Sequence, residues 1–230
     1  MLPEAFCTQS EGIFLRIIAS VYLGAAEREA WHALTGSARY RRQWLLGRAC
    51  IKEAVRYWIY HRTAELLPPA EITVVHDDRG APHADGWWRD TLVAAPSISL
   101  THDVHACLVA LVDPVQRVGV DRERLGRIRR PELLREALAP PEQASLHGLD
   151  EASQQERLLR IWCAKEAAAK FLGEGLGGSP TEFEVAFVDP ASHQAHVARG
   201  ATSVLVDLIT DDGSIIALAS EPLQESHPCE

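Results

Sequence analysis

Two acidic residues at the end of a predicted strand have the spacing needed to bind a divalent cation. Asp121 and Glu123 lie in the segment Val118-Gly119-Val120-Asp121-Arg122-Glu123. Successive side chains of a strand point to opposite faces, so the two carboxylates share one face and Arg122 takes the other. Mg²⁺ prefers carboxylate oxygens, with water, a substrate phosphate or another carboxylate completing its shell. The spacing fits the alternative equally well, in which Asp121 caps the next turn and Glu123 pairs with a nearby arginine.

A third carboxylate lies on the strongest helical segment of the second half, residues 153–172. Trp162, Glu166 and Lys170 are spaced four residues apart, so they share one face of a helix. A solvated Glu–Lys pair, which stabilises a helix by about 0.2–0.5 kcal/mol, is the ordinary explanation for this spacing. The large aromatic side chain of Trp162 on the same stripe indicates a partly buried face, which favours a functional site.

Several cationic residues could bind phosphate groups. The first long helical segment carries four of them: Arg41, Arg42, Arg48 and Lys52. Arginine offers bidentate hydrogen bonding to phosphate and lysine offers a point charge. The alternative is a solvated helix face. Thr101-His102 lies between two strand-like segments, and a single histidine is more often a surface or core residue than a ligand.

The elements that must position these residues indicate an α+β fold. Helical patterns cover residues 25–34, 38–66 and 153–172, and strand patterns cover 97–100, 104–112, 117–121, 203–209 and 214–220. The strands follow one another as hairpins rather than alternating strictly with helices, which argues against a doubly wound sheet. We also expect a first strand at Ile13–Leu23, because this run is rich in Ile, Val and aromatic residues.

The chain divides near Asp113-Pro114 into two halves, each combining helices with a few strands. We therefore expect an N-terminal subdomain at 1–113, a C-terminal subdomain at 114–222 and a flexible tail at 223–230. No convincing repeat relates the two halves in sequence.

Composition excludes several classes of function. The 230 residues carry 23 basic and 32 acidic side chains, a net charge of −9, so binding of nucleic acid through the bulk field is disfavoured. The five cysteines lack C-x-x-C spacing, which argues against a zinc cage or a disulfide framework and favours a reducing, cytoplasmic compartment. The run 13–23 is too short to span a membrane. Only three basic residues are lysines, Lys52, Lys165 and Lys170, and all three fall in the helical motifs.

Taken together, these motifs resemble the 4′-phosphopantetheinyl transferases of the larger, monomeric Sfp type, especially those associated with polyketide synthases. The matching segments occur in the family's order over roughly residues 38–178. They are Gly47-Arg48 with Lys52 and Ala54, Arg79-Gly80-Ala81-Pro82, Ser99-Leu100-Thr101-His102, Val118 to Glu123, and Trp162 to Lys170 with Gly173-Glu174-Gly175-Leu176. The last is the most specific.

The resemblance implies two similar α/β subdomains with coenzyme A in the cleft between them. It also implies transfer of the phosphopantetheine arm of coenzyme A to a serine of an apo acyl or peptidyl carrier protein, in polyketide, fatty-acid or nonribosomal peptide biosynthesis. Adenosine 3′,5′-bisphosphate would be released. The enzyme would be a holo-acyl-carrier-protein synthase that uses Mg²⁺, with Mn²⁺ as an alternative.

The residue roles that the resemblance implies fall into three groups. Asp121, Glu123 and Glu166 would bind the metal. Lys170 would be catalytic by contacting the pyrophosphate and assisting its cleavage. Glu166 is also a catalytic candidate on chemical grounds, because its carboxylate could accept the serine proton directly or through a metal-bound water. The residues that would bind coenzyme A are Arg41, Arg42, Arg48, Lys52, Arg79, Gly80, Thr101, His102, Lys165 and Lys170.

Three positions depart from the common pattern of the family. Ala81 replaces a frequent lysine, so we expect recognition of adenine or phosphate in that turn either to fall to Arg79 or to be weaker. Asp103 places an acid beside the expected phosphate site, and Arg122 replaces an aliphatic residue between the metal carboxylates. None of these changes removes a ligand or a motif lysine.

An arginine-rich segment suggests where the partner binds. Residues 117–130 contain six arginines against two acids, a local positive excess in an acidic chain. Carrier proteins of this class are typically acidic, so the expected docking surface is Arg122, Arg124, Arg127, Arg129 and Arg130. A solvated arginine-rich loop explains the composition equally well.

Two other functions remain open at this stage. A noncatalytic carrier-binding module with the same fold would be expected to lack a metal carboxylate or a motif lysine, and none is missing. A different Mg²⁺-dependent phosphoryl-transfer enzyme is disfavoured because the chain has no P-loop motif.

Overall fold

The computed structural model describes residues 13–102, 106–126, 131–188, 191 and 193–221 and has a mixed α+β fold, as the sequence predicts. The first half contains α2 (Ile13–Tyr22), α3 (Ala25–Ala33), α4 (Ala38–Thr63), the 3₁₀ turn η1 (Pro69–Glu71) and α5 (Trp88–Thr91). Its strands are β1 (Thr73–His76), β2 (Pro82–Asp85), β3 (Ser97–His102) and β4 (Cys107–Val112), paired antiparallel as β1-β2 and β3-β4.

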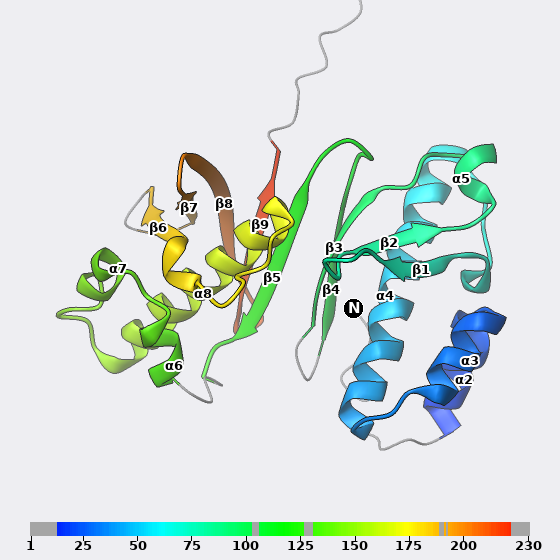
Figure 1. Ribbon diagram of the computed structural model, residues 1–230, viewed down its shortest axis with the longest axis horizontal. Helices are drawn as coiled ribbons and strands as arrows, with labels where there is room; N and C mark the ends of the chain where they lie inside the picture. The colour runs from blue at the N-terminus through cyan, green and yellow to red at the C-terminus, as the bar shows by residue number, and fades with distance from the viewer. Residues whose placement is uncertain (1–12, 103–105, 127–130, 189–190, 192, 222–230) are drawn as a thin grey trace, which may run out of the picture.

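The second half is built on a five-stranded antiparallel sheet in the order β5-β9-β8-β7-β6. The strands are β5 (Val118–Arg124), β6 (Glu184–Phe187), β7 (Gln194–Arg199), β8 (Thr202–Asp211) and β9 (Ser214–Ser220). The helices are α6 (Pro131–Glu136), α7 (Pro140–Ala144), α8 (Glu151–Leu172) and the 3₁₀ turn η2 (Pro180–Glu182). Helix α8 lies across β5, β9 and β8, and β3 of the first half lies beside β5 (Figure 1).

The two long helices have clear start and stop signals. The Ser37 hydroxyl accepts a hydrogen bond from the Tyr40 amide at the start of α4, and the Asp150 carboxylate caps α8 through the Ser153 amide. Helix α8 ends at Gly173, whose φ of 70° is the left-handed conformation that glycine adopts without strain. In the part of the chain that the structure describes, no helix combines the length and apolar character required to cross a membrane.

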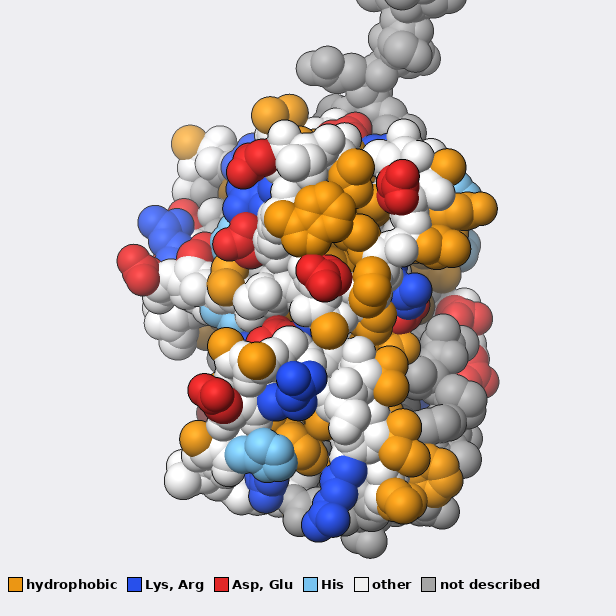
Figure 2. Space-filling view, turned by 90° about the vertical axis from the view of Figure 1, so that its right-hand side faces the viewer, with side chains coloured by type: hydrophobic (Ala, Val, Ile, Leu, Met, Phe, Trp, Pro, Cys, Tyr) orange, Lys and Arg blue, Asp and Glu red, His pale blue; other side chains and the backbone are white. Residues whose placement is uncertain are grey.

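The expectation of a strand at residues 13–23 is wrong, because this segment forms α2. Leu15, Ile18 and Ala19 recur at helical spacing and pack into a core shared with α4. Three hydrophobic residues of α2 stay exposed: Ile13, Ile17 and Val21. Hydrophobic side chains also gather on the face of the molecule that Figure 2 shows. The β-branched composition suggested a strand, but burial of one helical stripe against α4 decides the conformation.

A buried Lys–Glu pair recurs in both halves and relates them structurally. In the second half, Lys165 Nζ donates to Glu142 Oε2 at 2.7 Å, and Glu142 also accepts from the backbone amides of Ala139 and Val185. In the first half, Lys52 and Glu27 form the same pair, and Glu27 accepts from the amides of Gly24 and Val74. In each half the glutamate lies in the first turn of a short helix, α3 or α7, and the lysine lies in the long helix, α4 or α8. The more distant of the two amides belongs to the first strand of the hairpin that follows the long helix, β1 or β6. The two halves are therefore similar units, although no repeat is visible in the sequence.

Helix α8 and strand β5 approach each other closely at Gly119. A Cβ atom at this position would lie 1.9 Å from the Ala167 carbonyl oxygen and 2.6 Å from the Phe171 amide nitrogen. Only glycine allows this approach, which sets α8 directly against the strand that carries Asp121.

Candidate active site

Asp121 lies at the centre of the residues predicted to carry chemistry, and both halves of the chain hold its carboxylate. Its Oδ1 accepts hydrogen bonds from Thr101 Oγ1 at 3.0 Å and from Lys170 Nζ at 2.9 Å. Thr101 comes from β3 of the first half, and Lys170 from α8 of the second. Asp121 is only 6% exposed, and its Oδ2 is buried without a hydrogen-bond partner among the described residues.

Glu166 faces the same strand from α8, one turn before Lys170. Burial raises the pKa of its carboxyl group, the negative charge of Asp121 raises it further, and Lys170 opposes the increase. Asp121 and Lys170 therefore both act electrostatically on Glu166. The raised pKa makes the Glu166 carboxylate a stronger proton acceptor than an exposed glutamate.

Cys163, one turn before Glu166 on α8, is fully buried in the core of the second half. Burial raises the pKa of its thiol well above the ordinary value, and the charges of Asp121 and Glu123 add to the increase. The charges of Asp121 and Glu123 therefore both act on this thiol. Cys163 is thus an unreactive core thiol.

Lys170 connects the helix to the strand. Its ammonium group donates to the Val120 carbonyl oxygen at 2.9 Å as well as to Asp121, and 28% of its side chain is exposed. Part of the side chain thus remains accessible to a substrate.

The first half contributes a second contact to β5. The Val120 amide donates to Ser99 Oγ at 2.9 Å, two residues before Thr101 on the same face of β3. His102 follows at the exposed end of this strand. The side chains of Ser99 and Thr101, on one face of β3, therefore form hydrogen bonds with the consecutive β5 residues Val120 and Asp121.

A turn of the first half reaches the glycine-rich segment after α8. Arg79 Nη1 donates to the Gly173 carbonyl oxygen at 3.0 Å. The Asp77 carboxylate accepts from the amides of Arg79 and Ala81 and so shapes the turn that contains Gly80. Two segments of the predicted motif set that are far apart in sequence are thus brought together.

Arg48 contacts an aromatic ring and acts electrostatically on His76. Its guanidinium stacks 3.5 Å from the centroid of the Trp44 ring, and burial lowers its pKa while Glu27 opposes the decrease. Burial also lowers the pKa of His76, and the charges of Arg48 and His83 lower it further. Arg48 and His83 therefore disfavour the charged form of His76. Sequence offered no signal for His76 and His83, because the hairpin β1-β2 had to be known first.

The predicted coenzyme A contacts of Lys52 and Lys165 need correction. Both side chains are fully buried, and their ammonium groups are engaged by a glutamate and by backbone carbonyl oxygens, of Tyr22 for Lys52 and of Ala137 and Pro180 for Lys165. Such groups offer no accessible donor to a phosphate, and releasing them would leave a buried acid unpaired. We assign both lysines to the cores of their halves.

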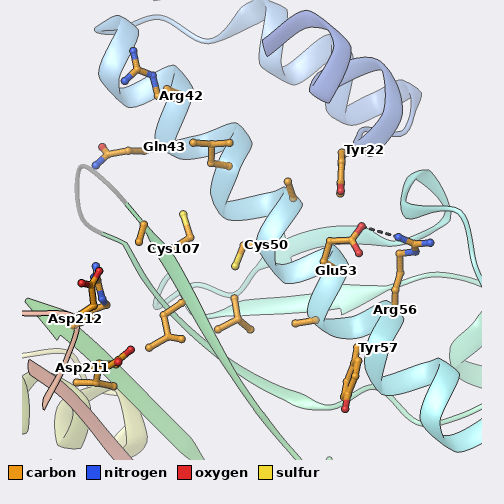
Figure 3. Close-up of a pocket in the computed structure, with 18 of the residues that line it drawn as sticks. Tyr22, Arg42, Gln43, Cys50, Glu53, Arg56, Tyr57, Cys107, Asp211 and Asp212 are labelled. Atoms are coloured by element: carbon orange, nitrogen blue, oxygen red, sulfur yellow. Dashed lines mark hydrogen bonds and ion pairs between the residues drawn. The ribbon is translucent and has the colours of Figure 1, made fainter. Parts of the chain in front are cut away.

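Arg41 and Arg42 lie on different faces of α4. The Arg41 guanidinium is 5.4 Å from the centroid of the Trp31 ring. Arg42 lines a cavity of about 810 Å³ between α4, β4 and the β8–β9 turn (Figure 3). Arg122, Cys50 and Cys107 also line this cavity, whereas Asp121, Glu166 and Lys170 do not. Arg122 thus points away from the acids, as strand alternation predicts.

The expected docking surface is only partly described. Arg122 and Arg124 are half-buried on β5. The remaining members, Arg127, Arg129 and Arg130, lie outside the described residues, as does Asp103.

The predicted metal site has one suitable ligand oxygen, but its three carboxylates do not form a complete coordination shell. Among the described residues, no three His, Cys, Asp or Glu side chains are grouped closely enough to hold a metal ion. Asp121 Oδ2, however, is a buried carboxylate oxygen without a hydrogen-bond donor among the described residues, and the Asp121 charge acts on the nearby Glu166. A buried carboxylate oxygen of this kind requires a cation or a hydrogen bond, so the residues present fit a divalent ion.

Comparisons with known proteins agree with the predicted class. Residues 117–219 match the model of the 4′-phosphopantetheinyl transferase superfamily, which supports a 4′-phosphopantetheinyl transferase. No curated protein matches the chain.

Two solved structures are similar over part of the chain. One is a holo-(acyl-carrier-protein) synthase from Bacillus anthracis in complex with CoA (3′,5′-ADP), with 23% identity, a TM-score of 0.39 and coverage of 45% of this chain and 93% of that chain. The other is a holo-ACP-synthase from Plasmodium yoelii, with 20% identity, a TM-score of 0.38 and coverage of 45% and 91%.

Proposed function

We propose that this chain transfers the 4′-phosphopantetheine arm of coenzyme A to a serine of an apo acyl or peptidyl carrier protein. The observation that carries the proposal is the position of Asp121, which Thr101 and Lys170 hold from the two halves of the chain at 3.0 and 2.9 Å. The family match covers Asp121, Glu166 and Lys170 together, which adds support.

In the proposed reaction, the serine hydroxyl oxygen attacks the pyrophosphate phosphorus that bears the pantetheine arm. The bond from this phosphorus to the bridging oxygen breaks, and adenosine 3′,5′-bisphosphate leaves with the bridging oxygen. Phosphoryl transfer of this kind depends mainly on positioning and charge neutralisation. The chain needs no covalent intermediate.

Each residue has a defined role in this proposal. Glu166, with its raised pKa, accepts the serine proton. Lys170, which is partly exposed beside Asp121, contacts the pyrophosphate. Asp121, Glu123 and Glu166 would hold Mg²⁺, which when bound would neutralise charge on the pyrophosphate oxygens.

Coenzyme A would lie between the halves, where Arg79 contacts Gly173. Arg48, His102 and the turn at Arg79-Gly80 are the first-half groups that we propose for its phosphates and adenine. Arg41 completes this set, whereas Arg42 lies on the cavity face of α4.

Several finer features are part of the same proposal. We place the enzyme among the Sfp-type transferases, acting as a cytoplasmic monomer in polyketide, fatty-acid or nonribosomal peptide biosynthesis. Its subdomains would span 1–113 and 114–222, followed by a tail at 223–230. The arginines from Arg122 to Arg130 would attract an acidic carrier.

The proposal is tested by incubating the protein with coenzyme A, Mg²⁺ and a panel of apo carrier proteins, then measuring intact carrier mass. We expect at least one carrier to gain a phosphopantetheine group on its serine. A carrier that binds the protein without gaining mass would instead indicate a noncatalytic module.

A further inference from the structure

We infer that Thr101 positions the Asp121 carboxylate for a divalent cation and does not bind a phosphate of coenzyme A. The inference rests on the proposed function, in which Asp121 is a metal ligand. It replaces the role that the resemblance implied for Thr101.

The hydrogen-bonding capacity of Thr101 supports this assignment. A threonine hydroxyl has one proton to donate, and that of Thr101 goes to Asp121 Oδ1 at 3.0 Å. An ionised phosphate oxygen can only accept a hydrogen bond. To donate to such an oxygen, the Thr101 hydroxyl would have to give up its hydrogen bond to Asp121. Thr101 is also only 5% exposed, which restricts its contact with a ligand in the cleft.

The two oxygens of Asp121 are treated differently by their surroundings. Oδ1 accepts from Thr101 and from Lys170, whereas Oδ2 is buried and has no hydrogen-bond partner among the described residues. The two donors fix the plane of the carboxylate and leave Oδ2 with its lone pairs available. A cation ligand is held in this way when outer-shell hydrogen bonds orient it.

Strand β3, which carries Thr101, also fixes the backbone next to Asp121. Ser99 Oγ accepts from the Val120 amide at 2.9 Å, and Ser99 is buried like Thr101. The alternate residues Ser99 and Thr101 thus hold the main chain and the side chain of consecutive β5 residues. This arrangement couples the position of the carboxylate to the first half of the protein.

Thr101 has a further role if Lys170 moves to contact the pyrophosphate. Lys170 is partly exposed and shares its ammonium protons between Asp121 and the Val120 carbonyl oxygen. The hydroxyl of Thr101 would then remain as the donor that keeps Asp121 Oδ1 in place during the reaction.

The test compares Thr101→Val, which keeps the shape but removes the hydroxyl, with Thr101→Ser, which restores it. Two titrations are made on the full chain: Mn²⁺ without coenzyme A, and coenzyme A in the presence of EDTA. We expect Thr101→Val to weaken Mn²⁺ binding by about 10-fold or more, with coenzyme A affinity unchanged. Thr101→Ser should bind Mn²⁺ within about 3-fold of wild type.

A fall in coenzyme A affinity in EDTA with unchanged Mn²⁺ binding would overturn the inference, as would Mn²⁺ binding that Thr101→Val leaves intact. Thermal unfolding of both variants checks that they are folded. If Thr101→Val weakens Mn²⁺ binding but the wild type transfers nothing to any carrier, the proposed function fails while the positioning role stands.

Discussion

The Lys165 ammonium nitrogen lies 2.7 Å from Glu142 Oε2 in the core of the second half, and each side chain is only 1% exposed. Burial lowers the pKa of Lys165, and the hydrogen bond and charge of Glu142 oppose the decrease. The acid also holds the amides of Ala139 and Val185, so this one pair joins α7, α8 and β6. It fixes the register of α8, the helix that carries Glu166 and Lys170.

Replacing Lys165 with methionine should therefore destabilise the protein without changing the ligand site directly. The variant leaves the Glu142 charge buried without its counterion, and we expect a loss of about 3–5 kcal/mol in the free energy of unfolding, measured with urea. The matched control is Lys170→Met on the same helix, which should lose about 1–2 kcal/mol, because its ammonium group is partly solvated. Equal losses for the two variants would contradict the assignment of Lys165 to the core.

Gly119→Ala should separate α8 from β5. Its new Cβ would meet the Ala167 carbonyl oxygen and the Phe171 amide, which are backbone atoms of a packed helix and cannot move alone. We expect a loss of about 3 kcal/mol or more on urea unfolding, together with weaker Mn²⁺ binding because Asp121 and Glu166 move apart.

Gly47→Ala on α4 is the control for this variant. There the new Cβ would lie 3.3 Å from the flexible end of Leu100, and the exchange of glycine for alanine favours a helix by about 0.5–1 kcal/mol. We expect its stability to stay within about 1 kcal/mol of wild type. A Gly119→Ala variant as stable as Gly47→Ala would show that the close approach at Gly119 does not constrain the site.

The turn that presents Arg79 should loosen in acid. The Ala81 amide lowers the pKa of Asp77 most, desolvation opposes the decrease, and the Arg79 amide and His83 lower the pKa further. Because the folded pKa is depressed, the stabilisation is present above the ordinary aspartate pKa of about 3.9 and is lost as pH falls through the lower, folded value. The amide resonances of Arg79 and Ala81, followed by NMR from pH 7 downwards, should shift together with a midpoint below that ordinary value.

Asp77→Asn retains an oxygen that can accept both amides and should keep the turn without the acid transition. A midpoint at or above the ordinary aspartate pKa, or an unchanged transition in Asp77→Asn, would contradict this account of the turn.

The short-range parts of the site could be predicted from sequence because they depend on periodicity. Strand alternation separated Asp121 from Arg122, and helical spacing placed Glu166 and Lys170 on one face of α8. The motif lysines could not be told apart in this way. Lys165 and Lys170 are five residues apart on one helix, and only the packing of α7 and η2 against α8 shows that the first is enclosed.

The long-range parts required the folded chain. The bond from Thr101 to Asp121 joins residues 20 positions apart across two halves, and the Glu27–Lys52 pair joins residues 25 apart. Neither pairing can be predicted from helical or strand periodicity. The expectation of a strand at residues 13–23 failed for a related reason. Leu15, Ile18 and Ala19 are buried on one side of a helix because α4 packs against them, and the local sequence does not reveal that α4 lies there.

The most direct test of the account is the intact mass of an apo carrier protein after incubation with coenzyme A, Mg²⁺ and either wild-type protein or the double variant Asp121→Ala with Glu166→Ala. We predict a phosphopantetheine adduct with the wild type and at least a 1,000-fold slower appearance with the double variant, corresponding to about 4 kcal/mol of lost transition-state stabilisation. Absence of the adduct with wild type across a panel of carriers would contradict the transferase function. Adduct formation that survives the double substitution would contradict the site.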